Sequence, residues 1–378
     1  MTDQTAFDTI VTIEHIEALR AYEPLLDGQV VQVLYHTYFC HGGGRFVASD
    51  DTSSGDDNGL VIVSRKGCRW KRLLEHHERG NILNWGADPS GEKDSAPAFI
   101  AAVADEEART VVVPHEGFYR IGQSVDLVGH VSLLGGACDE FGQRSAYSNV
   151  VAGIGLDGPM FINVGGSVQG IAFDGCNQKG GGLHLLGYGN VIKDCTFNSF
   201  KEAVVMPDGG EVSLVDNIFT RTGMAIRITG AVTCMAGRFI RNRFQCVHDC
   251  IVAEGELVGW NFVDNSFEHV SGKGIHGRAV HDCYFQGNWW ECRNGAEDGS
   301  CISADNYQQF FNNTACANYC IHGWVSIFSD ERCDNRIGGV MTGSGQVIAR
   351  LPVEHAIQNG SSSACGNDGV ISSSEGEM

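Results

Sequence analysis

Hydrophobic residues recur along this chain at intervals of about 23 residues from Phe173 onward. One aromatic or aliphatic position can be followed almost to the end of the sequence, at Phe173, Phe197, Phe219, Phe244, Phe267, Trp290, Ala315 and Ile337. Self-similarity at a spacing of this size indicates a solenoid, in which each repeat buries its apolar face only by stacking on the next repeat.

Two further positions keep the same register. A polar residue or cysteine lies two residues before the aromatic position, at Cys195, Asn217, Asn242, Asn265, Asn288, Asn313 and Asn335. An apolar residue lies five before it, at Ile192, Leu214, Phe239, Phe262, Phe285 and Phe310. Because strand side chains alternate between two faces, this spacing describes a strand that turns a corner at the Asn. A second short strand follows the aromatic position, with members from 203–205 to 320–322.

The repeats are too short for other solenoids. Units of 20 to 25 residues that hold only short strands leave no room for the helix of a leucine-rich repeat or the four strands of a propeller blade. The sequence therefore predicts an all-β chain built as a right-handed parallel β-helix. Successive coils should lie ~4.8 Å apart, so that Phe stacks on Phe and Asn on Asn. The last four phenylalanines of the second list are expected to form one buried column.

The chain before the repeats changes character twice. Residues 1–80 predict a small β-rich module that includes a short amphipathic helix around Ile13, Ile16 and Leu19 and strands over 29–34, 45–48 and 60–64. Residues 81–108 predict a linker and a helix that caps the open end of the solenoid. Asp94 or Ser95 would be the N-cap of this helix, and its apolar face would consist of Phe99, Ile100 and Val103. The β-helix is expected over 109–350, followed by a flexible, Ser-rich tail over 351–378.

The net charge and the spacing of the cysteines limit which binding partners and metal sites are expected. The 26 basic and 46 acidic residues give a net charge of −20, which argues against nucleic acid or an anionic membrane as a partner. A membrane-spanning apolar run and a signal peptide are not expected. The 15 cysteines include no CxxC pair, so buried thiols are favoured over a metal site, and disulfides stay open. We expect neither a metal nor a cofactor.

Four segments in order carry a family resemblance: Trp85-Gly86-Ala87-Asp88 with Gly91, the helix that begins Asp94-Ser95-Ala96-Pro97-Ala98-Phe99, the strand 111–114 and the strand 117–121. This order resembles bacteriophage tailspike proteins of the pectate-lyase-like β-helix superfamily. Residues 27–31, 42–46, 49–57 and 69–73 are similar to the small module that often precedes that β-helix.

The resemblance implies a virion protein, made without a signal peptide, that binds and often cleaves a bacterial surface polysaccharide such as a capsule or O-antigen. It also implies a homotrimer whose N-terminal module attaches to other tail or baseplate proteins. Such spikes commonly end in a trimerisation domain, whereas these repeats end near Arg350. Trimer contacts are therefore expected from the β-helix flanks or from the first 80 residues.

The repeat register also predicts which acids can meet. The position after the aromatic column reads Asn198, Thr220, Gln245, Glu268, Glu291 and Cys316, so two glutamates occupy equivalent sites on adjacent coils. Carboxylates ~5 Å apart suit the acid and the nucleophile of a retaining glycosidase. Asp249 and Asp264 are the second-choice catalytic acids. Chance neighbours among 46 acidic residues are the alternative explanation of the pair.

Outward aromatic and basic residues supply the candidate sugar contacts. Trp289 lies on the outer face beside Glu291, and Tyr319 and Trp324 border the next coil. Arg243 and His276 complete the predicted substrate-binding set. An exposed Trp can equally mark a subunit interface. A lyase that used Arg243 with His248, or Arg278 with His281, is the rival mechanism, and a non-catalytic virion appendage or adhesin is the rival function.

Overall fold

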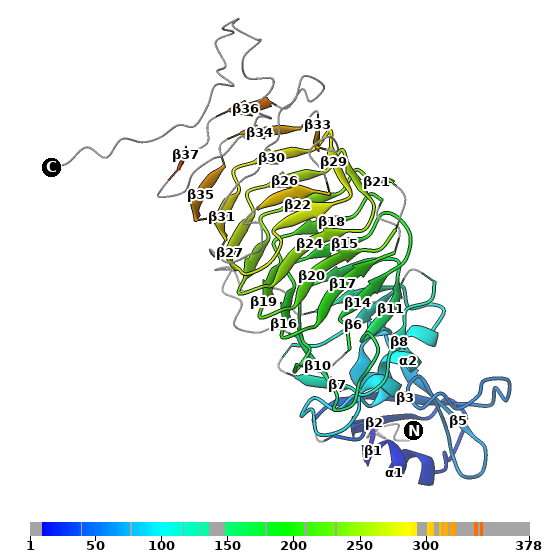
Figure 1. The fold of residues 1–378 in the computed structure, drawn as a ribbon. Coiled ribbons are helices and arrows are strands. Elements are labelled where there is room, and N and C mark those ends of the chain that lie inside the picture. Colours follow the sequence, from blue (N-terminus) through cyan, green and yellow to red (C-terminus); the bar gives the residue numbers. More distant parts are fainter. Residues whose placement is uncertain are drawn as a thin grey trace, which may run out of the picture.

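The computed structural model describes residues 10–38, 40–75, 78–115, 117–129, 131–135, 148–177, 180–207, 210–230, 233–292 and 301–305, and the short pieces 310–311, 313–316, 318–322, 336–338 and 341–342. In these residues a small sheet stands at the N-terminal end of a long stack of parallel strands (Figure 1). The predicted all-β parallel β-helix with an N-terminal β module is confirmed.

The N-terminal module is a five-stranded sheet in the order β1-β2-β3-β5-β4. Its elements are β1 (Val11–His15), α1 (Ile16–Ala21), β2 (Val30–Tyr35), β3 (Gly42–Ser49), β4 (Val61–Val63) and β5 (Arg69–Leu73). The predicted helix is correct for the buried residues Ile16 and Leu19 and wrong for Ile13. Ile13 belongs to β1 because that segment pairs in parallel with β2, opposite Val33.

A linker joins the module to the β-helix through η2 (Ile82–Trp85) and α2 (Ala96–Ala104). Ser95 is the N-cap of α2, as predicted. The predicted apolar face is correct for Phe99, which is buried, and wrong for Ile100, which is 42% exposed. The helix turns its alanines and Phe99 towards the first coils instead, and the Phe99 ring packs edge-on against Phe161 at 5.5 Å.

Hydrogen bonds from Arg72 connect the module to this linker. The guanidinium is buried and donates to the carbonyl oxygens of Gly59, Gly43 and Gly42 in the module and of Asn84 in η2, at 2.7 to 3.3 Å. Burial lowers the pKa of Arg72 to about 10. Because buried charged donors need partners, these four carbonyls fix how the module meets the first coil.

The β-helix winds through three long sheets. The first sheet holds β6 (Thr110–Val112), β9 (Ser132–Leu134), β12 (Ser167–Gln169), β15 (Val191–Lys193), β18 (Ser213–Val215), β22 (Arg238–Ile240), β26 (Asn261–Val263), β30 (Tyr284–Gln286), β34 (Thr314–Cys316) and β36 (Arg336–Gly338). The second sheet holds β7 (Phe118–Ile121), β10 (Ser148–Ala152), β13 (Ile171–Asp174), β16 (Thr196–Asn198), β19 (Ile218–Thr220), β23 (Arg243–Gln245), β27 (Ser266–Val270), β31 (Trp289–Cys292), β35 (Tyr319–His322) and β37 (Met341–Thr342).

The third sheet holds β8 (Val125–Asp126), β11 (Phe161–Val164), β14 (Leu183–Leu185), β17 (Glu202–Met206), β20 (Met224–Ile228), β24 (Asp249–Ala253), β28 (Ile275–Gly277) and β32 (Ile302–Ala304). A shorter fourth sheet, β21 (Thr233–Met235), β25 (Glu256–Val258), β29 (Ala279–His281) and β33 (Phe310–Phe311), leads back towards the first. Each coil therefore presents a separate outer face on each sheet.

The predicted aromatic column forms the core of the second sheet. Rings from Phe173 to Trp290 stack with centroids 4.1 to 5.2 Å apart. The prediction is wrong after Trp290, because Trp290 pairs with Cys320, while Ala315 and Ile337 belong to the first sheet. The buried column of the first sheet is likewise confirmed through Phe285, whose partner on the next coil is Ala315. Phe310 pairs with Val280 in the fourth sheet.

The Asn column marks the corner between the first and second sheets, as predicted. The side-chain oxygen of Asn242 accepts from the backbone N–H of Asn217 at 3.1 Å, and this contact repeats up the stack. Asn288 is followed by Asn318 rather than by the predicted Asn313. The reason is length, because 30 residues separate the two members there and only 23 separate Asn265 from Asn288 on the coil before. For the same reason 320–322 belongs to the second sheet, not the third.

The buried residues Cys195 and Cys283 are free thiols. Cys195, Cys250 and Cys301 are buried on inward positions, as predicted, and the side chain of Cys320 lies outside the described residues. Burial raises the pKa of Cys195 and of Cys283 to about 12. These thiols are therefore protonated packing groups at neutral pH.

Candidate active site on the second sheet

The outer face of the second sheet brings together most of the predicted site residues. Arg243, Ser266, Trp289 and Tyr319 are register partners on β23, β27, β31 and β35. In the neighbouring outer column Gln245 is followed by Glu268 and Glu291, and Glu291 pairs through the backbone with His322. The two glutamates therefore face each other across one strand spacing of ~4.8 Å, as the repeat predicts. The predicted next member, Cys316, belongs to the first sheet.

Glu268 is held by two donors. The guanidinium of Arg243 donates to Oε2 at 2.8 Å, and the hydroxyl of Ser266 donates to Oε1 at 2.7 Å. Burial acts to raise the pKa of Glu268, but the hydrogen bonds from Arg243 and Ser266 outweigh it and hold the pKa below the ordinary value. Glu268 is therefore a carboxylate at neutral pH.

Glu291 faces a histidine that the sequence did not indicate. Its Oε1 lies 3.6 Å from Nε2 of His269. His269 has a φ of 55° at a register shift between Glu268 and Val270 on β27. A bulge of this kind redirects a side chain, and here it sends the imidazole outward beside the acid pair. The buried Nδ1 of His269 has no hydrogen-bond partner.

His269 also belongs to a ladder of its own. Ser199, Arg221 and Cys246 precede it at the ends of the second-sheet strands, and all four have φ between 50° and 59°. The backbone amides of the three preceding residues donate to the next coil in the same way, as from Cys246 to the carbonyl of Glu268. A left-handed corner residue interrupts strand alternation, so the alternating pattern gives no signal for it.

Trp289 is an exposed aromatic residue beside the two glutamates. Its side chain is 39% exposed, and it lies two residues from Glu291 on the same side of β31. Tyr319 pairs with Trp289 through the backbone, and its side chain lies outside the described residues. The predicted contact residue Trp324 lies wholly outside them.

The second-choice acids have other contacts. Asp249 begins β24 in the third sheet, and its Oδ1 accepts from the backbone N–H of Lys273 at 2.7 Å, which anchors the next coil. Asp264 has a φ of 53° at the corner before Asn265. It therefore lies at the corner between β26 and β27, outside the strand that carries Glu268. Neither aspartate is part of the pair.

The predicted contact residue His276 lies on a different face. It belongs to β28 in the third sheet, where its Nδ1 is 2.9 Å from the hydroxyl of Ser303 and its Nε2 is 3.3 Å from Asp305. The structure thus divides the predicted substrate-binding set between two outer faces.

The described residues hold neither a cluster of metal ligands nor a membrane-spanning helix. Within the described residues, no three His, Cys, Asp or Glu side chains converge as ligands for a metal ion. No helix in that part of the chain is both long and apolar enough to cross a membrane. A cavity of about 600 Å³ lies between the N-terminal module and the first coil, lined by residues that include Gly42, Arg45, Glu78 and Asn81.

Comparison with known proteins agrees with this architecture. Residues 12–75 match the family described as phage tail protein small four-stranded beta-sheet domain. A segment of 96 residues is 32% identical to the amylovoran biosynthesis protein AmsF of Erwinia amylovora, and it spans 25% of this chain and 13% of that protein.

Solved structures extend the similarity over the β-helix. The tailspike protein of Acinetobacter baumannii phage AM24 aligns with a TM-score of 0.58 and 16% identity, over 88% of this chain and 65% of that chain. The tailspike protein gp49 of Acinetobacter baumannii bacteriophage Fri1, a capsular polysaccharide depolymerase, aligns with a TM-score of 0.56 and 13% identity, over 92% of this chain and 78% of that chain. At this identity the likeness concerns the fold.

Proposed function

We propose that this chain, a tailspike-like β-helix protein with a phage tail module, binds and depolymerises a bacterial surface polysaccharide such as a capsule or O-antigen. The observation that carries the proposal is the pair Glu268 and Glu291, register partners on the outer face of adjacent coils. The shared fold with gp49, itself a capsular polysaccharide depolymerase, supports the substrate class.

The two glutamates have different surroundings, which suggests their roles. Glu268, ionised through Arg243 and Ser266, is the nucleophile, and Glu291 is the acid. Glu268 attacks the anomeric carbon while Glu291 donates its proton to the leaving glycosidic oxygen. A covalent sugar ester on Glu268 forms and the glycosidic bond breaks. Glu291 then takes a proton from the water that hydrolyses this ester, which restores both groups.

Trp289 would position the sugar for this reaction. An exposed indole covers the apolar face of a pyranose, and Trp289 precedes the acid Glu291 by two residues on the same face. Tyr319, its register partner, and Trp324 remain predicted contacts on the next coil. His276 would meet only a polysaccharide that also reaches the third sheet.

Hydrolysis is favoured over elimination by the contacts of the basic residues. A lyase needs a free cation to hold a uronate and a base beside it. Arg243 is committed to Glu268, and Arg278 lies 3.3 Å from Glu256. His281 lies 2.7 Å from Asp282. Each cation already has a carboxylate of this chain as its partner.

The proposal is tested by measuring the length of polysaccharide chains after incubation with the protein. The protein should shorten at least one member of a panel of bacterial capsules and O-antigens, measured by size-exclusion chromatography. Glu268→Gln and Glu291→Gln should each slow cleavage by at least about 10³-fold, because shape is kept and only proton transfer or attack is lost. Glu107→Gln, at an exposed acid on the linker, should change nothing. If both Gln variants cleave like the unmodified protein, the acid assignment is wrong, and Asp249 and Asp264 come next.

The non-catalytic reading has its own outcome in the same experiment. An adhesin or structural appendage would bind a polysaccharide of the panel and leave its chain length unchanged. Binding without shortening by the unmodified protein would therefore replace depolymerisation with attachment as the function.

The proposed assembly is a homotrimer attached to other tail or baseplate proteins through residues 12–75, the part that matches a phage tail domain. Exposed apolar side chains support a subunit contact on the flanks, among them Val128, Leu134, Ile154, Leu186 and Tyr188. Val205, an outward position of the third sheet, is only 7% exposed and adds little to this apolar surface. Light scattering should give three times the 40.7 kDa chain mass, and a monomer at micromolar concentration would contradict it.

A further inference from the structure

The outer face of the third sheet carries a second group of reactive side chains. Its outward column runs through His184, Val205, Arg227, Val252, His276 and Ser303. The isoleucines before the last two members, Ile275 and Ile302, are buried in the core. Strand alternation therefore directs His276 and Ser303 to the outside, on adjacent coils.

His276 lies between a hydroxyl and a carboxylate. Its Nδ1 is 2.9 Å from Oγ of Ser303, and its Nε2 is 3.3 Å from Oδ1 of Asp305. A carboxylate beside Nε2 favours the proton on that nitrogen, because it stabilises an N–H directed at it. Nδ1 is then the unprotonated nitrogen, and it accepts the hydrogen bond of the Ser303 hydroxyl.

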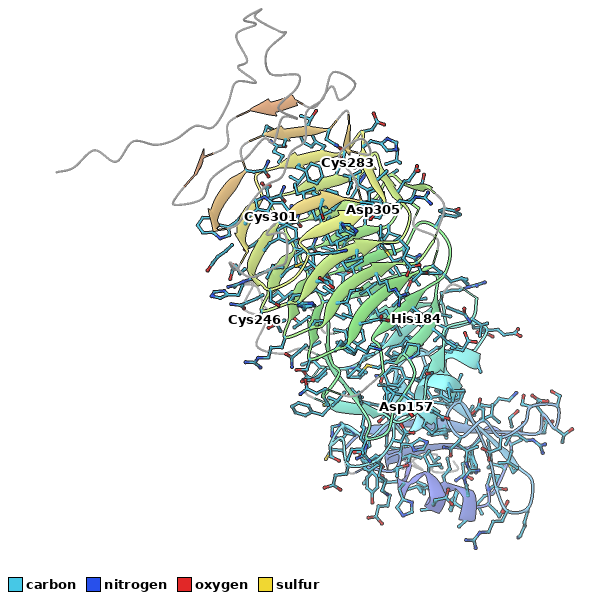
Figure 2. All side chains as sticks on the ribbon, in the orientation of Figure 1. Asp157, His184, Cys246, Cys283, Cys301 and Asp305 are labelled. Carbon is cyan, nitrogen blue, oxygen red and sulfur yellow. The ribbon has the colours of Figure 1, made fainter. Side chains whose placement is uncertain are left out.

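These three groups are within reach of solvent to different degrees. The Asp305 side chain is 55% exposed, the His276 side chain is 14% exposed, and Ser303 is 7% exposed. Figure 2 labels Asp305 on the upper part of the β-helix. The backbone N–H of Asp305 donates to the carbonyl of Arg278 at 3.4 Å, so the basic residue Arg278 stands on the coil next to Asp305.

We propose that Ser303, His276 and Asp305 form a hydrolytic triad that cleaves carboxylic esters, such as the O-acyl groups of sugars. Ser303 Oγ attacks the ester carbonyl carbon, and its proton passes to His276 Nδ1. The ester C–O bond breaks, the alcohol leaves with that proton, and an acyl group stays on Ser303. Water then gives its proton to His276 and its oxygen to the acyl carbon, which releases the acid and regenerates the hydroxyl.

Another Ser–His pair on the same molecule lacks the third group. His248 Nδ1 is 3.0 Å from the hydroxyl of Ser271. Within the described residues, no carboxylate forms an ion pair with His248, and the adjacent Asp249 accepts from the backbone of Lys273. Ser271 is therefore the matched control for Ser303: it has the same neighbour without the same orientation of the imidazole.

The test uses the full chain with a fluorophosphonate, which reacts only with activated serine hydroxyls. Peptide mass spectrometry should find the adduct on the peptide that contains Ser303 and none on the peptide that contains Ser271. This reading needs no variant, so it holds even if a substitution impairs folding. An adduct on Ser271 alone, or on neither serine, overturns the proposal.

Hydrolysis of p-nitrophenyl acetate gives the matching rates. Ser303→Ala and His276→Ala should each slow turnover by at least about 10²-fold, and Ser271→Ala should leave it unchanged. Asp305→Asn, at a positioning residue, should lower kcat with KM kept within about twofold. A Ser303→Ala variant that hydrolyses the ester at the unmodified rate contradicts the triad. Glu268→Gln should keep ester hydrolysis and Ser303→Ala should keep depolymerisation, which separates this proposal from the first.

Discussion

The two sides of the second sheet follow opposite rules. Inside, the same ring type recurs from Phe173 to Phe267 and ends in Trp290, with each ring stacked on the next. Outside, one column changes at every coil, from Thr196 and Ile218 to Arg243, Ser266 and Trp289. An inward side chain packs against the equivalent residues on the coils above and below. A substitution there is therefore tolerated only if those neighbours change with it. An outward one meets solvent, so chemistry can be placed on a single coil.

The largest effect on stability is expected from breaking the inner stack. Phe219 is fully buried between Phe197 and Phe244, with centroids at 4.9 and 5.0 Å. Phe219→Ala should lower the free energy of unfolding by ~3–5 kcal/mol, because it removes the ring and leaves a cavity. Urea unfolding measures this. Phe118→Ala, at an exposed ring on β7, is the control and should change little. Equal losses in both variants would mean that the stack adds nothing.

A smaller loss is expected at the corner between the first and second sheets. Asn265 is buried, accepts from the backbone N–H of Asn242 and donates to the carbonyl of Phe239. Asn265→Ala should destabilise the protein by about 1–3 kcal/mol, since it leaves both groups without a partner. The control is Asn261→Ala on the outer face of β26, expected within about 0.5 kcal/mol of the unmodified protein. A cost at Asn261 as large as at Asn265 would contradict the ladder.

On the outer side, Trp289→Ala should weaken polysaccharide binding by about tenfold and leave the unfolding free energy nearly unchanged. The reason is that the exposed indole stacks on sugar rather than on the core, and one such contact contributes on the order of 1 kcal/mol. Isothermal titration with a polysaccharide that the protein cleaves, in the Glu268→Gln background, measures this. Phe118→Ala removes an exposed ring at the opposite end of the same sheet and should bind normally. Unchanged affinity of the Trp289 variant would assign the indole another role.

The smallest effect concerns pH. The pKa of Glu268 is lower in the folded protein than in the unfolded chain. The ionised carboxylate therefore stabilises the fold at pH values above the unfolded pKa, and this stabilisation is lost as the pH falls through the folded pKa. Cleavage should therefore persist below the usual pKa of a glutamate. Arg243→Gln removes the guanidinium and should move the acid limb of the pH–rate profile to higher pH. An acid limb that stays in place would show that Arg243 does not set this ionisation.

The sequence predicts the inner side of the β-helix better than the outer one. The ladder from Phe173 to Trp290 is readable because its spacing stays between 22 and 25 residues. The spacing from Asn288 to Asn318 is 30 residues, so a fixed period assigns Asn313, Ala315 and Phe310 to the wrong columns. A fixed spacing assigns residues to columns correctly only while all coils have the same length. After one longer coil, every later assignment is shifted.

The outer site is predictable only where it follows the register. Glu268 and Glu291 share a column, so the repeat places them side by side. His269 is absent from that prediction because its left-handed backbone at a bulge reverses the side that alternation assigns. The contact of Asp305 with His276 depends on how the chain leaves β32, which no residue spacing encodes.

The anomeric configuration of the freshly cut polysaccharide tests the central claim most directly. If Glu268 attacks and Glu291 protonates across one strand spacing, the new reducing end must first appear with the configuration that the bond had in the polymer. Proton NMR within the first minutes of cleavage, before mutarotation, records this. Retention is the predicted result. Inversion, or an unsaturated sugar at the new end, would contradict the assignment of this pair as nucleophile and acid.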